Sequence, residues 1–590
     1  MEQGLTKGVK RVEDGAEAFV EVLNSIPTIE YIFADTGTDH APLIEALARL
    51  DEAGRKRPKL ITAPHEIAAV SMAIGYYAVS GSPQIALVHT VPGTLNAHGM
   101  VANAFSSRIP LILVAGRTPV TESGIFGGKT IGIHWTQETR DQGGLIRDCV
   151  KWDYEHRTNS QIADVVFRAH KIAMSEPRGP VYLIFPRELW AEKVKEVKIP
   201  PRGRYAPAAP PRGNPEQIKE AAEALLDAES PLAIPDASGR SRAFPAALVR
   251  LSDLVGLRVT PTFNTMSYPT NDTSFLGQHG SGGQQGSSSS HMKEADALLL
   301  LDTAVPWIPN LASPREDAKT ILVDADPSFA NIPIWSFPID LPIAAASDLA
   351  VQAMADAAED ILSRDPGRRR VVAERRERVK EQHLQLKAKL EDDVRRVRGS
   401  KPIDFVWLSH CIGQVKEPDT VIINEYDLKP NYLEFTEPGT LHGNLRLGCL
   451  GWGLGGGVGA KLAAPGKTVI ATLGDGAYIG GVPTACHFTA NAFRIPLVAV
   501  IFNNQAWNAV KSATDSMYPT GVAARTKNFP GMELRPPPDY AAIARACGAH
   551  AETVEDPDQV IPALRRALEE ANRNKRQALL DVICKFPLAG

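Results

Sequence analysis

Residues 469–504 read VIATLGDGAYIGGVPTACHFTANAFRIPLVAVIFNN, and they indicate the fold class more clearly than any other part of the chain. Two apolar runs, VIATL and LVAVIF, end in small polar clusters: Gly474-Asp475-Gly476 after the first and Asn503-Asn504 after the second. Apolar runs that are separated by a helical segment are typical of parallel strands in an α/β sheet. We therefore expect both clusters at the carboxyl ends of strands, where open α/β sheets bind ligands.

The side chains of Asp475 and an asparagine offer hard oxygen ligands of the kind that Mg²⁺ prefers, often together with phosphate oxygens. The glycines of GDGAYIGG would let a phosphate approach backbone N–H groups at a helix N-terminus. Either cluster alone could be an ordinary turn, because Gly, Asp and Asn favour turns. Residues 477–502, which separate the clusters, can hold a helix and a strand, so together the clusters predict a magnesium and diphosphate site.

Composition excludes several classes of protein. Among 590 residues, Lys and Arg number 64 and Asp and Glu number 68, so the net charge of −4 provides no basic surface for nucleic acid or an anionic membrane. No apolar run reaches the length of a membrane span, and the first residues lack the apolar segment of a secretory signal. Six cysteines without a CxxC pair favour free thiols in a reducing compartment. We therefore expect a large, cytoplasmic globular protein.

Apolar runs alternate with helical patterns in three blocks, which predicts an α/β fold with three doubly wound parallel-sheet domains. The Pro-rich segment after the first block predicts an extended linker, and the densely charged segment after the second predicts a solvated connecting helix, with an anion-binding patch as the alternative. Gly280–Met292 predicts a surface loop. The expected domains are residues 1–195, 215–360 and 400–590, and the linkers are 196–214 and 361–399.

The GDG and NN clusters at this spacing resemble the signature of thiamine-diphosphate-dependent enzymes. The resemblance implies thiamine diphosphate and Mg²⁺ as cofactors, with the first block as a pyrimidine-binding domain, the second as a central domain and the third as a diphosphate-binding domain. Asp475, Asn504 and the backbone carbonyl of Ala506 are the implied metal ligands, and Asn503 is the alternative to Asn504. The implied diphosphate contacts are Gly474, Asp475, Gly476 and Ala477.

The pair His65-Glu66 precedes the apolar helical pattern IAAVSMAIGYYAVSG. This is similar to the family pattern in which a glutamate hydrogen-bonds N1′ of the aminopyrimidine ring and so activates the cofactor, which implies that role for Glu66. A glutamate that only opposes a helix dipole is the alternative. Three further matches in the same order, at residues 36–38, 91–116 and 133–138, favour the catalytic role.

GCLGWGLGGGVGAKLA, residues 448–463, resembles the family segment that holds the cofactor in its bent form. The resemblance implies that Leu450 supports the bend and that the Gly448 backbone lies near the 4′-amino group. The alternative is a glycine-rich contact between helix and sheet. The remaining implied cofactor contacts are Asn96, Glu425 and Tyr426.

His89 begins HTVPGTLN, which resembles benzoylformate decarboxylase, where a histidine at this strand end relays protons. Imidazole suits that task near neutral pH, although a buried structural histidine is the alternative. Gln137-Glu138 is similar to acetolactate synthases, and residues 296–310 are distantly similar to 2-hydroxyacyl-CoA lyases. Weaker pocket candidates are His134, His442 and Asn424.

The sequence therefore predicts a lyase or carboligase that acts without net oxidation, with Glu66, His89, Gln137 and Leu450 as its catalytic residues. A 2-oxo acid decarboxylase with carboligase activity is the leading prediction. An acetolactate-synthase-like carboligase and a 2-hydroxyacyl-CoA lyase, which yields formyl-CoA and an aldehyde or ketone, are the alternatives, and a non-catalytic relative is a further one. No flavin signature is recognisable, and an ADP group in the central block stays open. The resemblance also implies a homodimer or homotetramer, in which Glu66 of one chain serves the cofactor bound at Asp475 of its neighbour.

Overall fold

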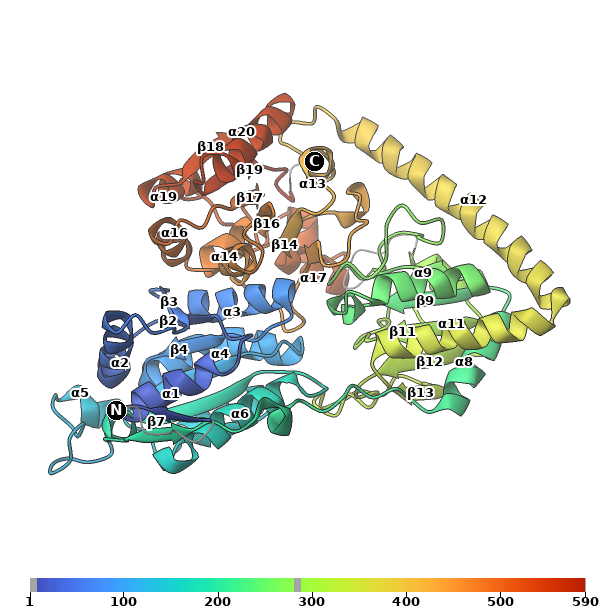
Figure 1. Ribbon diagram of the computed structural model, residues 1–590. Coiled ribbons are helices and arrows are strands. Elements are labelled where there is room, and N and C mark those ends of the chain that lie inside the picture. Colours follow the sequence, from blue (N-terminus) through green and yellow to red (C-terminus); the bar gives the residue numbers. More distant parts are fainter. Residues whose placement is uncertain (1–7, 281–287, 589–590) are drawn as a thin grey trace.

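The computed structural model describes residues 8–280 and 288–588. Three parallel sheets, each covered by helices on both faces, form the body of the chain, which confirms the predicted fold class. The first sheet lies below the third in Figure 1, and the central sheet lies beside both. The strands β1 (Val9–Arg11) and β8 (Glu196–Lys198) form a separate antiparallel pair, so part of the expected first linker is a strand.

The first sheet has six parallel strands in the order β3-β2-β4-β5-β7-β6. Its strands are β2 (Tyr31–Ala34), β3 (Lys59–Thr62), β4 (Ile85–Val88), β5 (Ile112–Arg117), β6 (Asp153–Glu155) and β7 (Val181–Pro186). Its main helices are α1 (Gly15–Asn24), α2 (Ala41–Glu52), α3 (Glu66–Ser80), α4 (Thr90–Ser106) and α6 (Ile162–Met174). Central strands such as β4 are buried along their whole length, which explains their apolar sequences.

The third sheet repeats this arrangement in the order β15-β14-β16-β17-β19-β18. Its strands are β14 (Val421–Glu425), β15 (Leu441–His442), β16 (Val469–Gly474), β17 (Val498–Asn503), β18 (His550–Val554) and β19 (Ala578–Ile583). Its helices are α13 (Phe405–Val415), α14 (Gly453–Ala463), α15 (Asp475–Gly480), α16 (Pro483–Ala492), α17 (Asn508–Met517), α18 (Val522–Thr526), α19 (Tyr540–Ala546) and α20 (Val560–Asn572).

The central sheet has five parallel strands in the order β10-β9-β11-β12-β13. Its strands are β9 (Pro231–Pro235), β10 (Arg258–Val259), β11 (Ala297–Leu301), β12 (Lys319–Asp324) and β13 (Leu341–Ala344). Its helices are α8 (Pro215–Asp227), α9 (Phe244–Val255), α10 (Ser288–Glu294) and α11 (Ser347–Arg364).

Helix α10 corrects part of the predicted loop at Gly280–Met292. The chain is helical from Ser288, because Met292 and Ala295 pack into the apolar core of the central domain. Residues 281–287 of the predicted loop lie outside the described residues.

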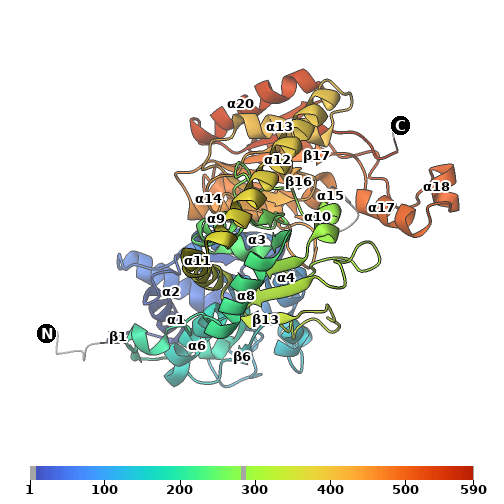
Figure 2. The same ribbon diagram turned by 90° about the vertical axis from the view of Figure 1, so that its right-hand side faces the viewer.

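Helix α12 (Pro366–Val397) is the connecting helix predicted from the charged segment. It spans 32 residues and runs from the central sheet to the third, as both ribbon views show (Figure 1 and Figure 2). Arg375 fastens it to the central domain, since Nη1 donates to the carbonyl of Val255 at 2.6 Å. Most of its other side chains are exposed, which explains its charged sequence. In the described part of the chain, no helix combines the length and hydrophobicity that a membrane span needs.

The first and third sheets meet where α3 crosses α14. The two backbones touch at a pair of glycines, since a Cβ on Gly75 would lie 1.9 Å from the carbonyl oxygen of Gly456. Only residues without side chains allow this approach.

The contacts around this crossing fix the relative direction of the two sheets. Thr62, at the carboxyl edge of the first sheet, accepts a hydrogen bond at 2.9 Å from Thr489, near the end of α16 that leads to the amino edge of the third sheet. Asn103, near the end of α4 at the amino edge of the first sheet, donates at 2.7 Å to Cys449, which precedes α14 at the carboxyl edge of the third. The carboxyl edges of the two sheets in one chain therefore face in opposite directions.

Candidate functional site

Asp475 joins two loops at the carboxyl edge of the third sheet. It begins α15 directly after β16, and its Oδ1 accepts a hydrogen bond from the N–H of Gly476 at 2.8 Å. Its Oδ2 accepts from the N–H of Gln505 at 2.6 Å, and Gln505 belongs to the loop after β17. Because β16 and β17 are neighbours in the sheet, the GDG and NN clusters lie together as the sequence predicted.

The two asparagines after β17 have different surroundings. Asn503 points to the neighbouring strand, where its Nδ2 donates to Asp581 Oδ1 at 2.9 Å. Asn504 stays within the loop, and its Oδ1 accepts from the N–H of Ala506 at 3.0 Å. This arrangement favours Asn504 over Asn503 as the residue that acts with Asp475.

The donor set around Asp475 fits a dication. Burial raises the pKa of Asp475 to about 7, with a further contribution from the negative charges of Asp427 and Asp581. Excess buried negative charge of this kind is relieved when a metal ion binds. Within residues 8–280 and 288–588, no group of three or more His, Cys, Asp and Glu side chains is arranged to hold a metal. A metal at this edge therefore needs amide and backbone oxygens, which Asn504 and Ala506 offer and which suit Mg²⁺.

The segment before α14 lies at the same edge. The buried carboxylate of Glu425 accepts backbone N–H bonds from Gly451 at 2.6 Å and Gly453 at 2.7 Å, so it fixes the segment in place. Leu450 lies beside α15, since a Cβ on Gly480 would be 3.6 Å from the Leu450 Cβ. Gly448 has a φ of +75°, in the left-handed region that favours glycine. The structure thus brings the third-sheet candidates together.

Tyr426 and Asn424 flank Glu425 in the chain. Tyr426 is 39% exposed at the sheet edge, where a Cβ on Gly448 would lie 3.2 Å from its hydroxyl. The amide oxygen of Asn424 instead accepts a hydrogen bond from Thr472 Oγ1 at 3.0 Å inside the sheet. Tyr426 can therefore reach a ligand at the edge, whereas the Asn424 side chain is engaged between two strands.

Glu66 lies at the carboxyl edge of the first sheet, as the first residue of α3. His65 caps this helix, accepting at Nδ1 from the N–H of Ile67 at 3.1 Å. The buried carboxylate of Glu66 accepts from Nδ2 of Asn96 at 3.2 Å, so two predicted cofactor residues are in contact. Asp35 is a second carboxyl group beside it, and burial together with the charge of Glu66 raises the pKa of Asp35 to about 6.

His89 follows β4 on the same edge and hydrogen-bonds Asp39 through Nδ1. Burial lowers the pKa of His89, but the hydrogen bond to Asp39, the interaction with Gln137 and the charges of Asp39 and Asp35 outweigh it, so the pKa is raised overall. Gln137 and His89, which lie 48 positions apart in the sequence, are therefore neighbours in the structure. His134 is buried nearby, with Thr38 Oγ1 3.5 Å from its Nε2.

The motifs did not identify Asp35, Asp39 and His40. All three follow β2 in the segment ADTGTDH, and β2 is hydrogen-bonded to β4 in the sheet. Residues that follow adjacent parallel strands meet at one edge, so the strand assignments together with His89 contained the necessary signal.

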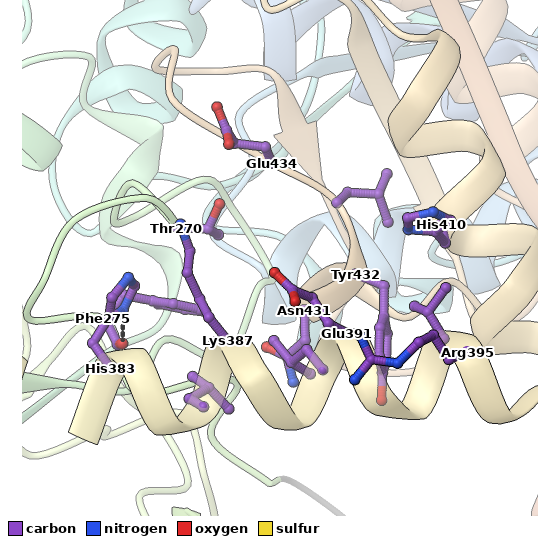
Figure 3. Close-up of a pocket in the computed structure, with 14 residues that line it drawn as sticks. Thr270, Phe275, His383, Lys387, Glu391, Arg395, His410, Asn431, Tyr432 and Glu434 are labelled. Atoms are coloured by element: carbon purple, nitrogen blue, oxygen red, sulfur yellow. Dashed lines mark hydrogen bonds between the residues drawn. The ribbon is translucent and has the colours of Figure 1, made fainter. Parts of the chain in front are cut away.

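His442 is the last residue of β15, the outermost strand of the third sheet. Its buried side chain lines a cavity of about 140 Å³ between the three sheets, together with Arg108, Arg240, Arg242 and Arg446. A cavity of about 400 Å³ lies beneath α12, with Lys387, Glu391, Tyr432 and Glu434 among its lining residues (Figure 3). It contains none of the predicted site residues, so its size alone does not make it the active site.

The carboxyl edge of the central sheet has three aspartates, and each is paired with an arginine. Arg108 donates to Asp324 at 2.5 Å, and Arg240 donates to Asp302 at 3.2 Å. Arg446 donates to Asp236 at 3.1 Å. The guanidinium groups of these three arginines are therefore already paired with carboxylates, which reduces the positive charge that could bind the phosphate of a nucleotide.

Comparison with known proteins shows the family of the chain. Models of the thiamine pyrophosphate enzyme family match in order: the N-terminal TPP binding domain over residues 13–145, the central domain over 218–354 and the C-terminal TPP binding domain over 428–582. Thiamine pyrophosphate is the same compound as thiamine diphosphate.

Three curated relatives match nearly the whole chain. Sulfoacetaldehyde acetyltransferase of Castellaniella defragrans is 27% identical, covering 96% of this chain and 93% of that protein. The acetolactate synthase large subunit of Haemophilus influenzae is 24% identical, covering 95% and 93%. Benzoylformate decarboxylase of Pseudomonas aeruginosa is 26% identical, covering 88% and 90%.

Among solved structures, the thiamine diphosphate-dependent 4-hydroxybenzoylformate decarboxylase of Rhodococcus jostii RHA1 has the same fold. It superimposes with a TM-score of 0.74 at 20% identity, covering 97% of this chain and 99% of that one. Because all three family domains are present in order, the chain belongs to the thiamine-diphosphate-dependent enzymes.

Proposed function

We propose that this enzyme uses thiamine diphosphate and Mg²⁺ to cleave or form a carbon–carbon bond without net oxidation, and that its main reaction is the decarboxylation of a 2-oxo acid. The observation that carries this proposal is His89, which Asp39 holds at the strand end on the same edge as Glu66. An imidazole is suited to giving a proton to a product and taking one from a substrate, because its ordinary pKa of about 6.5 lies near neutrality.

The residues have separate tasks in this proposal. Asp475, Asn504 and the Ala506 carbonyl would hold Mg²⁺ and, through the metal, the diphosphate, while Glu66 would hydrogen-bond the aminopyrimidine ring. When bound, thiamine diphosphate supplies a nucleophilic carbon and an electron sink next to the substrate carbonyl. Leu450, beside α15, would contact the bound cofactor through its apolar side chain.

Two chains are needed for one site. Glu66 and Asp475 belong to carboxyl edges that face in opposite directions within a chain, so Glu66 cannot reach the cofactor bound at Asp475 of its own chain. A second copy that presents its first sheet to the third sheet of this chain would complete the site. We therefore infer a homodimer as the smallest active form, with a homotetramer as its doubled form.

The cysteines are all unpaired, which supports the cytoplasmic location expected from the sequence.

The two alternative reactions differ from the decarboxylation in the substrates that they need. An acetolactate-synthase-like carboligase would add the same activated group to another 2-oxo acid, and the similarity to that enzyme keeps it as the second candidate. A 2-hydroxyacyl-CoA lyase needs a site for coenzyme A. The Asp–Arg pairs at the edge of the central sheet argue against such a site there.

A product assay tests the reaction. The enzyme with thiamine diphosphate and Mg²⁺ is offered pyruvate, benzoylformate, branched 2-oxo acids, sulfoacetaldehyde and a 2-hydroxyacyl-CoA in separate reactions, with Glu66→Gln as the control. Carbon dioxide with a free aldehyde supports the decarboxylase, and carbon dioxide with a hydroxyketo acid supports the synthase. Turnover only of sulfoacetaldehyde or the acyl-CoA, without carbon dioxide, contradicts the decarboxylase.

A further inference from the structure

Three side chains at the carboxyl edge of the first sheet form a His–Asp–His arrangement, in which Asp39 and His40 are buried and the side chain of His89 is 19% exposed. Asp39 and His40 belong to the turn η1 (Thr38–His40) after β2, whereas His89 follows β4. Nδ1 of His89 is hydrogen-bonded to Oδ1 of Asp39, and Nε2 of His40 lies 3.3 Å from Oδ2. Asp39 is 1% exposed and His40 is fully buried, so each oxygen of a buried carboxylate faces one imidazole nitrogen.

The hydrogen bonds of His40 determine where its proton lies. The N–H of Gly37 donates to Nδ1 of His40 at 3.0 Å, and a ring nitrogen that accepts a hydrogen bond carries no proton. Burial lowers the pKa of His40, so it is neutral with its single proton on Nε2, facing Asp39. This N–H therefore lies 3.3 Å from Oδ2 of Asp39, a contact that lacks the geometry of a hydrogen bond but places the positive end of the N–H dipole toward the carboxylate.

The same reasoning applies to His89. The interactions with His40 and His89 keep the pKa of Asp39 below its usual value in spite of burial, so Asp39 is an ionised group that only accepts hydrogen bonds. Nδ1 of His89 must then carry a proton. Nε2 is left as the nitrogen that can gain or lose a proton, and Gln137 is another polar side chain that raises the pKa of this ring.

Two glycines, one after β2 and one in β5 on the other side of β4, make room for this pair. A Cβ on Gly37 would lie 2.0 Å from Nδ1 of His89, and a Cβ on Gly116 in β5 would lie 1.6 Å from Oδ2 of Asp39. Any side chain at either position would displace one member of the pair. The ends of β2, β4 and β5 thus provide a fitted space for Asp39 and His89.

We propose that Asp39, supported by His40, is a positioning residue that holds His89 with Nδ1 protonated, so that Nε2 is the nitrogen presented to the substrate. This inference rests on the proposed proton-transfer role of His89. It assigns a positioning role to Asp39 and a supporting role to His40, which no sequence motif identified. In each proton transfer, the Nε2–H bond of His89 breaks as the proton moves to the acceptor, and the reverse transfer restores it. Asp39 stays ionised throughout.

Other groups also act on His89. Asp35 after β2 adds negative charge, and His134 from α5 (Ile133–Thr136) is a neutral neighbour because burial, followed by the charges of Arg187 and Lys129, lowers its pKa. The test must therefore separate the hydrogen bond of Asp39 from charge in general.

The test measures the protonation of His89 directly in the full-length enzyme. Diethyl pyrocarbonate reacts only with an unprotonated imidazole nitrogen, so the rate at which His89 is modified, read by peptide mass spectrometry across pH, reports its pKa. We expect a wild-type midpoint above the ordinary histidine value of about 6.5. Asp39→Asn should lower this midpoint by about one unit or more, whereas Asp141→Asn, which removes an exposed charge in the same domain, should leave it unchanged.

A second variant and the wild type keep the test decisive. Gly116→Ala should lower the midpoint in the same direction, because its methyl group takes the place of Asp39 Oδ2. A wild-type midpoint at or below 6.5 would overturn the proposal without any variant. An unchanged midpoint in a folded Asp39→Asn would overturn it as well.

Kinetics separate positioning from a general structural role. In Asp39→Asn, the acid limb of the kcat–pH profile should move together with the modification midpoint, while KM changes little. A loss of kcat that is equal at every pH would contradict the proposal. Failure of the wild type to bind thiamine diphosphate would instead contradict the proposed function, and the midpoint of His89 would still test the positioning role.

Discussion

The first and third sheets have the same strand order but carry different chemistry at their carboxyl edges. Strands β2 to β7 of the first correspond one by one to β14 to β19 of the third. Carboxylates and imidazoles follow the strands of the first sheet, whereas glycine turns and oxygen donors follow those of the third. One fold therefore serves two tasks, and the residues just after each strand decide which task.

The equivalent strands β4 and β16 show the difference most clearly. After β4 comes His89, whose ring is hydrogen-bonded to an aspartate from the neighbouring turn. After β16 comes Asp475, whose two oxygens accept backbone N–H groups from its own helix and from the loop after β17. In the proposed function, the first edge moves protons and the third edge holds a charged ligand.

Replacing Glu66 should remove the chemistry of the first edge alone. Glu66→Gln keeps the shape of the side chain but cannot act as a carboxylate, so we expect turnover to fall about 10²–10⁴-fold, the range for loss of acid–base catalysis. Thiamine diphosphate affinity, measured by calorimetry, should stay within a few-fold of wild type. An equal loss of affinity and turnover would show that the edges do not divide their tasks in this way.

Replacing Asp475 should instead weaken cofactor binding, and turnover should be lost mainly for that reason. Asp475→Ala removes the carboxylate proposed to bind Mg²⁺, so cofactor affinity should weaken by at least about 100-fold, because losing even an outer-shell partner of a metal ligand costs about 10- to 100-fold. High concentrations of Mg²⁺ and cofactor should restore part of the turnover in steady-state assays. Unchanged affinity would contradict the assignment of the third edge.

The contact between the sheets can be tested by adding one methyl group. Gly75→Ala would ordinarily favour a helix by about 1 kcal/mol. Its Cβ would meet the carbonyl of Gly456, so we expect a net destabilisation of about 3 kcal/mol from overpacking. Thermal unfolding measures the change, and Gly132→Ala, where a Cβ meets nothing within 4 Å, is the control. A Gly75→Ala variant as stable as the control would refute the close crossing.

A buried histidine in the first domain and another in the third should make the free energy of unfolding depend on pH. Burial lowers the pKa of both His156, after β6, and His442, in β15, to about 4. Since the unfolded chain takes up these protons near pH 6.5, stability should be complete above that pH and fall as the pH drops toward 4. Each group should cost about 2 kcal/mol at pH 5 relative to pH 7. His156→Gln or His442→Gln should reduce the loss of melting temperature between pH 7 and pH 5, and an unchanged loss in both would contradict this account.

Local sequence was sufficient to predict the third edge, because its residues form compact motifs after two successive strands. The GDG and NN motifs predicted that Asp475 and Asn504 lie at the carboxyl ends of two strands, and the alternating apolar runs predicted three parallel sheets. The charged segment predicted α12 because a long, mostly exposed helix needs charged residues on most of its surface.

The first edge was predicted less completely, because its decisive contact joins residues 50 positions apart. Asp39 resembles an ordinary turn residue until β2 and β4 are known to be adjacent. Likewise, His442 appeared to be a pocket candidate, and only the packing of three sheets places it in a separate cavity. The helix from Ser288 was missed because a serine run gives no apolar periodicity.

The central claim is that the two edges of one active site come from different chains. Glu66→Gln and Asp475→Ala are co-expressed with different affinity tags, the mixed dimers are isolated through both tags, and their turnover is measured. Each mixed dimer should contain one site with both residues intact, so we expect about half of the wild-type turnover per dimer, although either variant alone is nearly inactive. If the mixed dimers are as inactive as the separate variants, Glu66 and Asp475 act within one chain, and the account is wrong.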